Sequence, residues 1–319
     1  MARILVNDGL AKDALAKLQE AGIEVNSEKV RQEQLAGALQ DYDGIIVRSA
    51  TKIGRDIIDA CPNLKFIGRA GTGMDNIDVD YAKSKGIEVV NTPAAASESV
   101  AELVFAHAFS IARNLYHANR QMPDEAESNF KGLKKSFSNG LELRGKTLGV
   151  IGFGRIGQCV ARMGLGLGMN VLPFKLHAET VKIFVDFFKV KNASIAIDME
   201  TAAFGKLLTD SDIITIHVPY SPGDPPVLFR ERFNKMKDGV TIINTSRGGV
   251  IKEDDLIEAL DSGKVGAAGL DVYENEPTPD PKLLHHPQIS LTPHIGASTK
   301  EAQQRVGWEI AQKVIQFFE

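Results

Sequence analysis

The sequence predicts an α/β fold built from two doubly wound parallel-sheet domains. Along most of the 319 residues, short apolar runs alternate with segments of helical periodicity, which is the pattern of βαβ units. The apolar runs of the second half are continuous rather than alternating, as expected for strands that helices cover on both faces. The length exceeds that of one ordinary hydrophobic core, so two domains are expected.

The N-terminal part of the chain is expected to form the first sheet. Its predicted strands are 4–6, 23–25, 44–47, 65–68 and 88–91, with helices over 12–21, 33–39 and near Ile57. The Asn91-Thr92-Pro93 segment marks the end of this series. The helical tail from Ser298 is expected to return to the first sheet. The sequence therefore predicts one domain of residues 1–95 and 298–319 and a second domain of residues 96–297.

The second domain is expected to begin with a long helix over 98–113 that Ser97 caps. Pro123 and the polar stretch to Gly140 are expected to form an irregular connection. The strands that follow are predicted at 147–151, 170–174, 212–218, 240–245, 265–272 and 289–292. Between the second and third of these, apolar runs at 182–188 and 194–197 around a polar turn at 189–192 predict an added hairpin.

Composition excludes several classes of protein. The net charge of −4 and the pI of about 6.0 provide no basic field for nucleic acid. Two cysteines, Cys61 and Cys159, argue against a disulfide framework. The N-terminus lacks the apolar core of a signal peptide, and the most apolar helical stretch is too short to span a bilayer. We expect a cytoplasmic protein with no membrane, nucleic-acid or metal partner.

A glycine-rich segment at 148–157 predicts a dinucleotide site. It consists of an apolar strand, a turn with Gly152, Gly154 and Gly157, and a predicted helix. The glycines permit a tight turn and close approach of the backbone to a pyrophosphate, and the helix N-terminus supplies oriented N–H groups. Because the required strand and helix flank the motif, we expect a nicotinamide dinucleotide to bind here.

One expected partner of that cofactor is replaced. An acidic residue that follows the second strand usually holds the adenosine ribose, but Lys175 stands there. A lysine tolerates a 2′-phosphate and cannot accept hydrogen bonds from ribose hydroxyls. NADP use, weak NAD selection, a displaced acid such as Glu179, or a merely solvated lysine are all compatible with this replacement.

Three polar residues in the last quarter of the chain predict a reaction site. Arg247, Glu276 and His294 each follow an apolar run that reads as a buried strand, and strand carboxyl ends are where open α/β sheets bind ligands. Arginine offers a planar fork that matches a carboxylate. Histidine titrates near neutrality, and a nearby carboxylate favours its protonated form. The set suggests a site that holds an anion and moves a proton.

Together these motifs resemble the D-isomer-specific 2-hydroxyacid dehydrogenases. The resemblance covers nearly the whole chain, and the spacings from Arg247 to Glu276 to His294 agree with the family pattern. Besides the four motifs above, the segments that carry it are 47–52, 68–76, and 91–93 with 100–103. The resemblance implies a Rossmann cofactor domain inserted in a flavodoxin-like substrate-binding domain.

The resemblance also implies roles for individual residues. Arg247 would bind the substrate carboxylate, His294 would be the acid–base, and Glu276 would pair with His294. Asp271 would hold the nicotinamide amide. The other implied cofactor contacts are Thr72, Gly152, Gly154, Arg155, Ile156, Gly157, Lys175, Val218, Thr245, Ser246 and Gly296. The remaining histidines are expected to be structural or solvated. A homodimer through the cofactor domain is implied, with NAD as cofactor and NADP possible because of Lys175.

The implied substrate is a phosphorylated 2-hydroxy acid, 3-phosphoglycerate, oxidised to 3-phosphohydroxypyruvate at the start of serine synthesis. The expected substrate contacts are Arg48, Ser49, Arg69, Gly71, Gly73 and Lys135. Lys135 and Leu133 stand where the family usually has an arginine and a tryptophan, in a stretch that reaches the neighbouring subunit. A solvated lysine run is the alternative interpretation.

Two other functions remain open from the sequence. A reductase of glyoxylate or hydroxypyruvate would share the fold and Arg247, Glu276 and His294. A cofactor-sensing binding protein of the corepressor kind would share the fold without turnover. A formate dehydrogenase is disfavoured, because that relative has a glutamine in place of Glu276. Feedback through an added regulatory domain is not expected, since the chain ends at Glu319.

Overall fold

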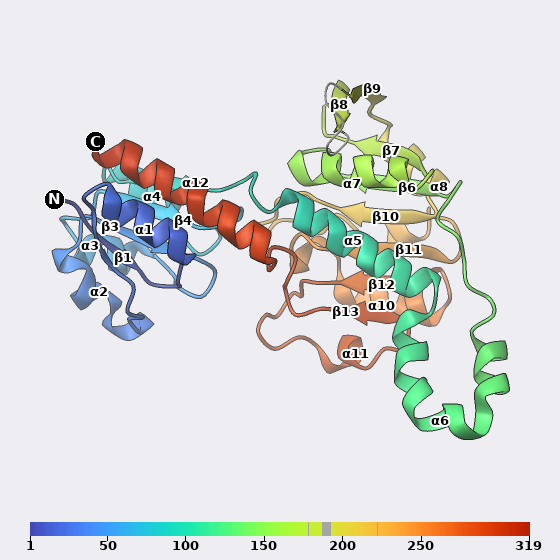
Figure 1. The fold of residues 1–319 in the computed structure, drawn as a ribbon. Coiled ribbons are helices and arrows are strands. Elements are labelled where there is room, and N and C mark those ends of the chain that lie inside the picture. Colours follow the sequence, from blue (N-terminus) through green and yellow to red (C-terminus); the bar gives the residue numbers. More distant parts are fainter. Residues whose placement is uncertain (178, 187–192, 222) are drawn as a thin grey trace. The chain divides into compact units, whose positions relative to one another are not determined.

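The computed structural model describes residues 1–177, 179–186, 193–221 and 223–319. The chain divides into two compact units, Met1–Ser99 with Ala297–Glu319, and Val100–Gly296. Each unit contains one parallel sheet with helices on both faces (Figure 1), so the predicted doubly wound α/β fold is confirmed. Within the described part of the chain, no helix combines the length and apolarity needed to cross a bilayer.

The first unit is built on a five-stranded sheet of order β2-β1-β3-β4-β5, which is the flavodoxin-like order. All of its pairings are parallel. The strands are β1 (Arg3–Val6), β2 (Glu24–Asn26), β3 (Gly44–Val47), β4 (Phe66–Arg69) and β5 (Glu88–Asn91). Each lies within one or two residues of its predicted position, because continuous apolar runs identify buried strands.

Helices cover both faces of this sheet. On one face, α1 (Lys12–Glu20) and the C-terminal α12 (Lys300–Phe318) bury side chains such as Leu18 and Ile310 against the strands. As expected, the tail therefore returns to the first sheet. The elements on and around the other face are η1 (Gln32–Gln34), α2 (Leu35–Ala38), η2 (Leu39–Asp41), α3 (Arg55–Ala60) and α4 (Val79–Ser84).

The second unit contains a six-stranded sheet of order β13-β12-β11-β10-β6-β7, again all parallel. The strands are β6 (Thr147–Ile151), β7 (Asn170–Phe174), β10 (Ile213–Ile216), β11 (Val240–Asn244), β12 (Val265–Leu270) and β13 (Ile289–Leu291). In the sheet, β7 lies on one side of β6, and β10, the strand of this sheet that comes next in the sequence, lies on the other side. This reversal creates the switch point beside which open α/β sheets bind ligands.

Two helix layers enclose the second sheet. The first contains α5 (Ser97–Ala112) and α7 (Arg155–Gly166), seen side by side in Figure 1. The second contains α8 (Phe204–Asp210), α9 (Arg230–Phe233), α10 (Glu253–Asp261) and α11 (Pro281–Leu284), with the short η3 (Gly248–Val250) before α10. Both layers bury apolar side chains, which explains why the strands are apolar on both faces.

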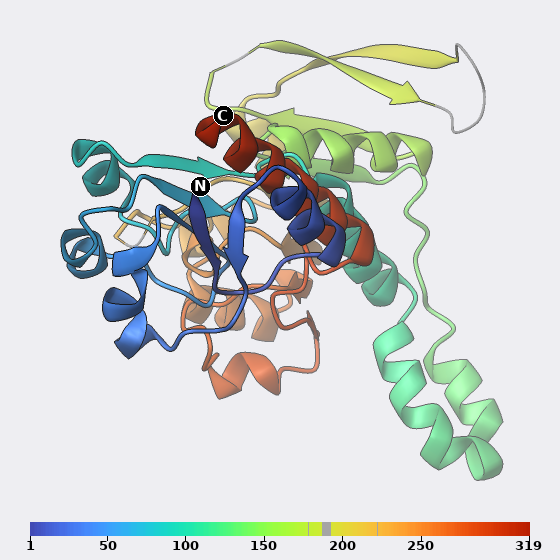
Figure 2. The same ribbon diagram turned by 60° about the vertical axis from the view of Figure 1, so that its left-hand side comes forward.

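Two local predictions were wrong. The segment expected to be irregular forms α6 (Leu115–Ser136), with Pro123 inside and non-helical torsion angles at Asn129 (φ −135°, ψ 32°). Its polar residues are those of a solvated helix, and Figure 2 shows the resulting bent arm extending from the sheet. Ser97 does not cap α5. Its own N–H already bonds to Ala94 O at 3.2 Å, and its buried hydroxyl has no partner in the described residues.

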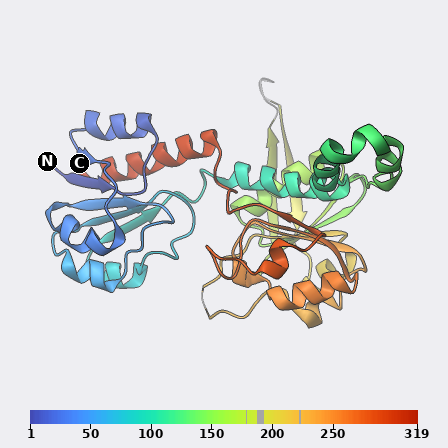
Figure 3. The same ribbon diagram turned by 90° about the horizontal axis from the view of Figure 1, so that it is seen from below.

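The predicted hairpin is present as β8 (Thr180–Asp186) and β9 (Ser194–Glu200), which pair in antiparallel fashion. Its turn at 189–192 lies outside the described residues. Ile183 and Met199 are buried in the apolar cluster that contains α7, whereas Phe184 and Ile195 are about half exposed. Figure 3 shows the two strands standing out from the sheet, directly after β7.

Candidate active site

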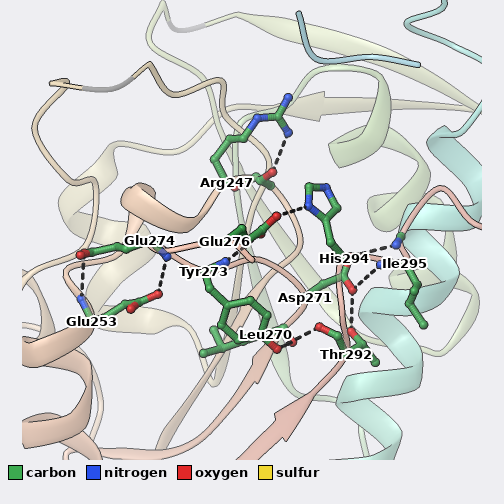
Figure 4. Close-up of polar contacts among 12 residues, drawn as sticks. Arg247, Glu253, Leu270, Asp271, Tyr273, Glu274, Glu276, Thr292, His294 and Ile295 are labelled. Carbon is green, nitrogen blue, oxygen red and sulfur yellow. Dashed lines mark hydrogen bonds and ion pairs between the residues drawn. The ribbon is translucent and has the colours of Figure 1, made fainter. Parts of the chain in front are cut away.

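Arg247, Glu276 and His294 gather at one edge of the second sheet. They follow β11, β12 and β13 respectively, and these three strands are neighbours. Because parallel strands share one carboxyl edge, the loops that follow them lie side by side. Figure 4 shows the three side chains drawn together at this edge, as predicted from the sequence.

Glu276 and His294 form a direct pair. His294 Nδ1 donates to Glu276 Oε2 at 2.7 Å, and Glu276 Oε1 accepts from the Tyr273 backbone N–H at 3.1 Å. The His294 side chain is 48% exposed, so the ring is accessible while its Nδ1 is engaged. The arrangement leaves Nε2 as the nitrogen that can exchange a proton with a small molecule.

The backbone of His294 is strained, and Asp271 maintains it. His294 has φ of 55°, in the left-handed region, which costs about 1–3 kcal/mol for a residue other than glycine. The fully buried Asp271 accepts the next two backbone N–H groups, Ile295 N and Gly296 N, both at 2.8 Å. It also accepts from Thr292 Oγ1 at 2.6 Å. These bonds fix the loop on both sides of His294.

A buried histidine completes this support. His107 on α5 bonds Ser290 Oγ through Nδ1 at 2.9 Å and Thr292 Oγ1 through Nε2 at 3.1 Å. Burial lowers the pKa of His107, so the ring is neutral. Since the Thr292 hydroxyl donates to Asp271, His107 Nε2 donates to Thr292 and Nδ1 accepts from Ser290. The sequence contains no local signal for this link, because His107 lies on α5 whereas Ser290 lies on β13 and Thr292 directly follows that strand.

Arg247 lies in a turn that Asn244 organises. Asn244 Oδ1 accepts from Ser246 N at 3.0 Å, and Asn244 Nδ2 donates to Arg247 O at 2.8 Å. Arg247 Nη1 donates to Ser246 O at 2.7 Å. Asn244 was not among the predicted site residues. An asparagine whose side chain accepts from the backbone N–H two residues further on is nevertheless a known local signal for a turn.

The Arg247 turn contacts the loop that contains Glu276. A Cβ built on Gly248 would lie 2.0 Å from both the carbonyl carbon and the oxygen of Tyr273, and 2.4 Å from Glu274 N. Only glycine permits this approach. The loop that contains Arg247 and the loop that contains Glu276 are therefore packed backbone to backbone.

The glycine turn after β6 fits a pyrophosphate. Gly152 has φ of 94°, and a Cβ there would lie 2.5 Å from His217 O; a Cβ on Gly157 would lie 2.3 Å from Gly152 O. By contrast, a Cβ on Gly154 would meet nothing within 4 Å, so the turn leaves open space at the start of α7. Close packing behind the turn, space in front of it and a helix N-terminus are the features that dinucleotide binding requires.

The other predicted cofactor residues fall into two groups. Those of the second unit lie in loops at the same carboxyl edge or in the first turn of α7; they are Arg155, Ile156, Lys175, Val218, Thr245, Ser246, Asp271 and Gly296. Thr72 lies in the first unit. Lys175 forms an ion pair with Glu179, and the Glu179 backbone is held at the hairpin base by Thr201 Oγ1 at 2.9 Å. The contact of each with a cofactor stays a prediction.

The predicted substrate residues of the first unit also lie at strand ends. Arg48 and Ser49 follow β3, and Arg69, Gly71 and Gly73 end or follow β4, its neighbour in the sheet. Asn76 Nδ2 donates to Arg48 O at 2.7 Å and so fixes this loop. Lys135 lies exposed on α6, in the second unit. Their contacts with a substrate stay predictions.

Comparison with known proteins agrees with this geometry. A family model for the NAD-binding domain of the D-isomer specific 2-hydroxyacid dehydrogenases matches residues 105–296. The chain is 44% identical over 316 residues to a hydroxypyruvate reductase from Thermotoga maritima, covering 98% of this chain and 97% of that protein. It is 41% identical over 315 residues to a D-3-phosphoglycerate dehydrogenase from Archaeoglobus fulgidus, covering 98% of this chain and 56% of that protein.

A solved structure gives the same result for the fold. A glyoxylate reductase from Paecilomyes thermophila superposes with a TM-score of 0.83 at 29% identity, covering 100% of this chain and 95% of that one. The fold and the matches define an NAD(P)-dependent dehydrogenase that acts on a hydroxy acid. The chain belongs to the D-isomer specific 2-hydroxyacid dehydrogenase family, which confirms the resemblance drawn from the motifs.

Proposed function

We propose that the chain oxidises D-3-phosphoglycerate to 3-phosphohydroxypyruvate with NAD, the reaction that opens serine synthesis. The observation that carries the 2-hydroxy acid chemistry is the 2.7 Å bond between His294 Nδ1 and Glu276 Oε2, with Arg247 on the adjacent strand end. Phosphoglycerate carries a carboxylate and a phosphate, so its recognition needs cations at both ends.

In this proposal each of the three residues has one role. Arg247 binds the carboxylate of the substrate through its planar fork. His294 Nε2 takes the hydroxyl proton during oxidation and returns it during reduction, which contributes roughly 10²–10⁴-fold to the rate. Glu276 orients the ring through Nδ1 and stabilises the imidazolium. The bound nicotinamide accepts or gives the hydride.

Replacing His294 by alanine tests this assignment. Turnover should fall by roughly 10²–10⁴-fold because the proton carrier is lost. The affinity for NADH, measured by fluorescence titration, should persist because the glycine turn is intact. His285, an exposed histidine of the same unit, provides the matched control, and His285→Ala should keep full activity. Near-original turnover in His294→Ala would exclude the proposed chemistry.

Arg48 and Arg69 support the phosphorylated substrate, because both lie at neighbouring strand ends of the first unit. Replacing each by alanine should raise the KM for phosphohydroxypyruvate while barely changing the KM for hydroxypyruvate. Arg55, an exposed arginine that pairs with Asp78 in the same unit, is the control. An equal effect on both substrates would assign these arginines a structural role.

Reduction of hydroxypyruvate or glyoxylate is the second candidate. Two observations favour it: the chain is 44% identical to the Thermotoga hydroxypyruvate reductase and 41% identical to the Archaeoglobus phosphoglycerate dehydrogenase, and Leu133 is buried within α6 rather than exposed. Steady-state rates with phosphohydroxypyruvate, hydroxypyruvate and glyoxylate decide between the candidates. A higher kcat/KM for an unphosphorylated acid would replace the first proposal.

We propose NAD rather than NADP as the cofactor. The ion pair between Lys175 and Glu179 supports this choice, because it places a carboxylate next to the lysine that replaced the usual acid. Glu179→Gln should weaken NADH binding relative to NADPH binding, measured as dissociation constants without turnover. Lys206 and Asp210 form a second exposed pair four residues apart, so Asp210→Asn is the control. An unchanged ratio of the two constants would exclude Glu179 from cofactor selection.

We also propose a cytoplasmic homodimer assembled through the second unit. The α6 arm supports it, because Leu115, Met122 and Phe130 are large apolar side chains that are 55%, 41% and 58% exposed. Sedimentation should show a dimer at working concentration. A monomer would contradict the proposal and would also remove Lys135 from the site of a neighbouring subunit.

A further inference from the structure

Glu253, the first residue of α10, is a buried carboxyl group outside the set described above. Its residue exposure is only 7%, and a carboxyl group in such a place requires hydrogen-bond partners. Glu253 Oε1 accepts from the Glu274 backbone N–H at 2.7 Å, and Glu274 Oε1 accepts from the Glu253 backbone N–H at 3.3 Å. Figure 4 shows this reciprocal pair beside Glu276.

The partner of Glu253 lies within the loop that positions Glu276. Glu274 is preceded by Tyr273, whose N–H donates to Glu276 Oε1 at 3.1 Å, and Glu276 Oε2 accepts from His294. The carboxyl group of Glu253 thus holds the N–H of Glu274, and the N–H of the preceding residue, Tyr273, holds Glu276. A displacement of Glu274 would be transmitted to the carboxylate that orients His294.

The loop is closely packed at one place and borders open space at another. The Cα of Gly248 lies against the backbone of Tyr273 and Glu274. Next to this contact there is a cavity of about 410 Å³, which Gly249, Lys252, Glu274 and Asn275 help to line. Because Glu274 and Asn275 border this cavity, a segment released from Glu253 has room to move.

The ionised form of Glu253 is unfavourable in this position. Burial, together with the Glu274 and Asp280 carboxylates, raises the pKa of Glu253 to about 7, and the opposing effects of the Glu274 N–H and Lys252 are smaller. A residue that served only to fill space would not need a titratable group here. Its geometry, rather than its charge, explains its presence.

We propose that Glu253 is a positioning residue that fixes the backbone of residues 273–276 and thereby holds Glu276 against His294. The inference rests on the proposed function of the Glu276–His294 pair. Glu253 itself touches neither substrate nor cofactor in this scheme, so its effect passes through the loop.

Variants at position 253 separate this role from simple packing. Glu253→Ala should lower kcat by about 10²-fold, the loss expected when a catalytic group moves by about 1 Å, while the KM for the keto acid stays within about threefold because Arg247 is unchanged. Glu253→Gln should keep most of the activity, because its amide oxygen accepts the same N–H. Glu253→Asp is too short to reach Glu274 N and should behave like Glu253→Ala. Asp254→Ala, at the exposed neighbouring carboxylate, is the control.

Two further measurements do not depend on the size of kcat. In Glu253→Ala and Glu253→Asp, hydrogen exchange at the amides of Tyr273 and Glu274 should become faster, while Glu253→Gln should retain protection. The pH profile of kcat/KM should shift in the same direction as in Glu276→Gln. If Glu253→Ala does not fold, Glu253→Asp and Glu253→Gln provide the same comparison.

The outcomes separate the inference from the proposed function. Unchanged kcat, pH profile and exchange in Glu253→Ala and Glu253→Asp, together with strong losses in Glu276→Gln and His294→Ala, would overturn the inference and leave the function standing. Full activity in Glu276→Gln and His294→Ala would instead remove the function, and the positioning role would fall with it.

Discussion

Replacing Glu253 by glutamine should change how the stability of this protein depends on pH. Burial raises the pKa of Glu253 from 4.5 to about 7, so the folded chain favours its protonated form. The resulting contribution to stability is fully present below about pH 4.5, where the group is neutral in both states. It is lost as the pH rises through about 7, because the unfolded chain releases its proton first.

The magnitude follows from the two pKa values. The interval between 4.5 and about 7 corresponds to roughly 3 kcal/mol, at about 1.4 kcal/mol for each pH unit. Since the residue is only 7% exposed, solvent screening reduces this figure little. Glutamine does not titrate, so Glu253→Gln should lack this loss and should gain stability relative to the original chain between pH 5 and pH 8.5.

Thermal unfolding of both proteins across this pH range measures the effect. The difference in Tm should move by roughly 5–10 °C in favour of Glu253→Gln as the pH rises, given about 2–4 °C per kcal/mol for a unit of this size. Asp254→Asn, at the exposed neighbour, should show no such trend. Parallel Tm curves for the original chain and Glu253→Gln would contradict this expectation, because they would mean that Glu253 has the same pKa in the folded and the unfolded chain.

Three other substitutions test the site. Gly248→Ala should lower kcat by about 10²-fold or more, because its Cβ would lie 2.0 Å from the Tyr273 backbone; Gly205→Ala, with nothing within 4 Å, should leave kcat unchanged. Arg247→Lys should raise the KM for the keto acid by about 10- to 100-fold, since lysine lacks the two-pronged donor; an unchanged KM would exclude carboxylate binding. Asp271→Asn should lower the free energy of unfolding in urea by about 1–3 kcal/mol, because an amide NH₂ would face a backbone N–H, and equal stability would contradict that account.

Much of the fold was predictable because its signals are local. Continuous apolar runs marked the strands, and Gly152, Gly154 and Gly157 marked the turn before α7. The site at the sheet edge was predictable for a related reason. Because Arg247, Glu276 and His294 each follow a parallel strand, their loops meet at the shared carboxyl edge of the sheet. This meeting can be predicted before the packing of the helices is known.

The failures arose where local signals were ambiguous. Pro123 and its polar neighbours suggested a loop, but a helix exposed to solvent has a similar composition, and the structure forms α6 there. Ser97 had the chemistry of a helix cap, yet the chain already turns at Ala94, so the serine lies inside α5 with a buried hydroxyl.

Arg247, Glu276 and His294 could be proposed as the reacting residues, and their place at one edge of the second sheet could be predicted, from the sequence, because spacing and apolar runs depend on near neighbours in the chain. The contacts that hold these residues became apparent only in the folded structure. Asp271 stabilises the left-handed backbone of His294, and Glu253 holds the loop of Glu276. These contacts join residues about 20 positions apart, on different elements, and such a pairing exists only after the strands and helices have packed.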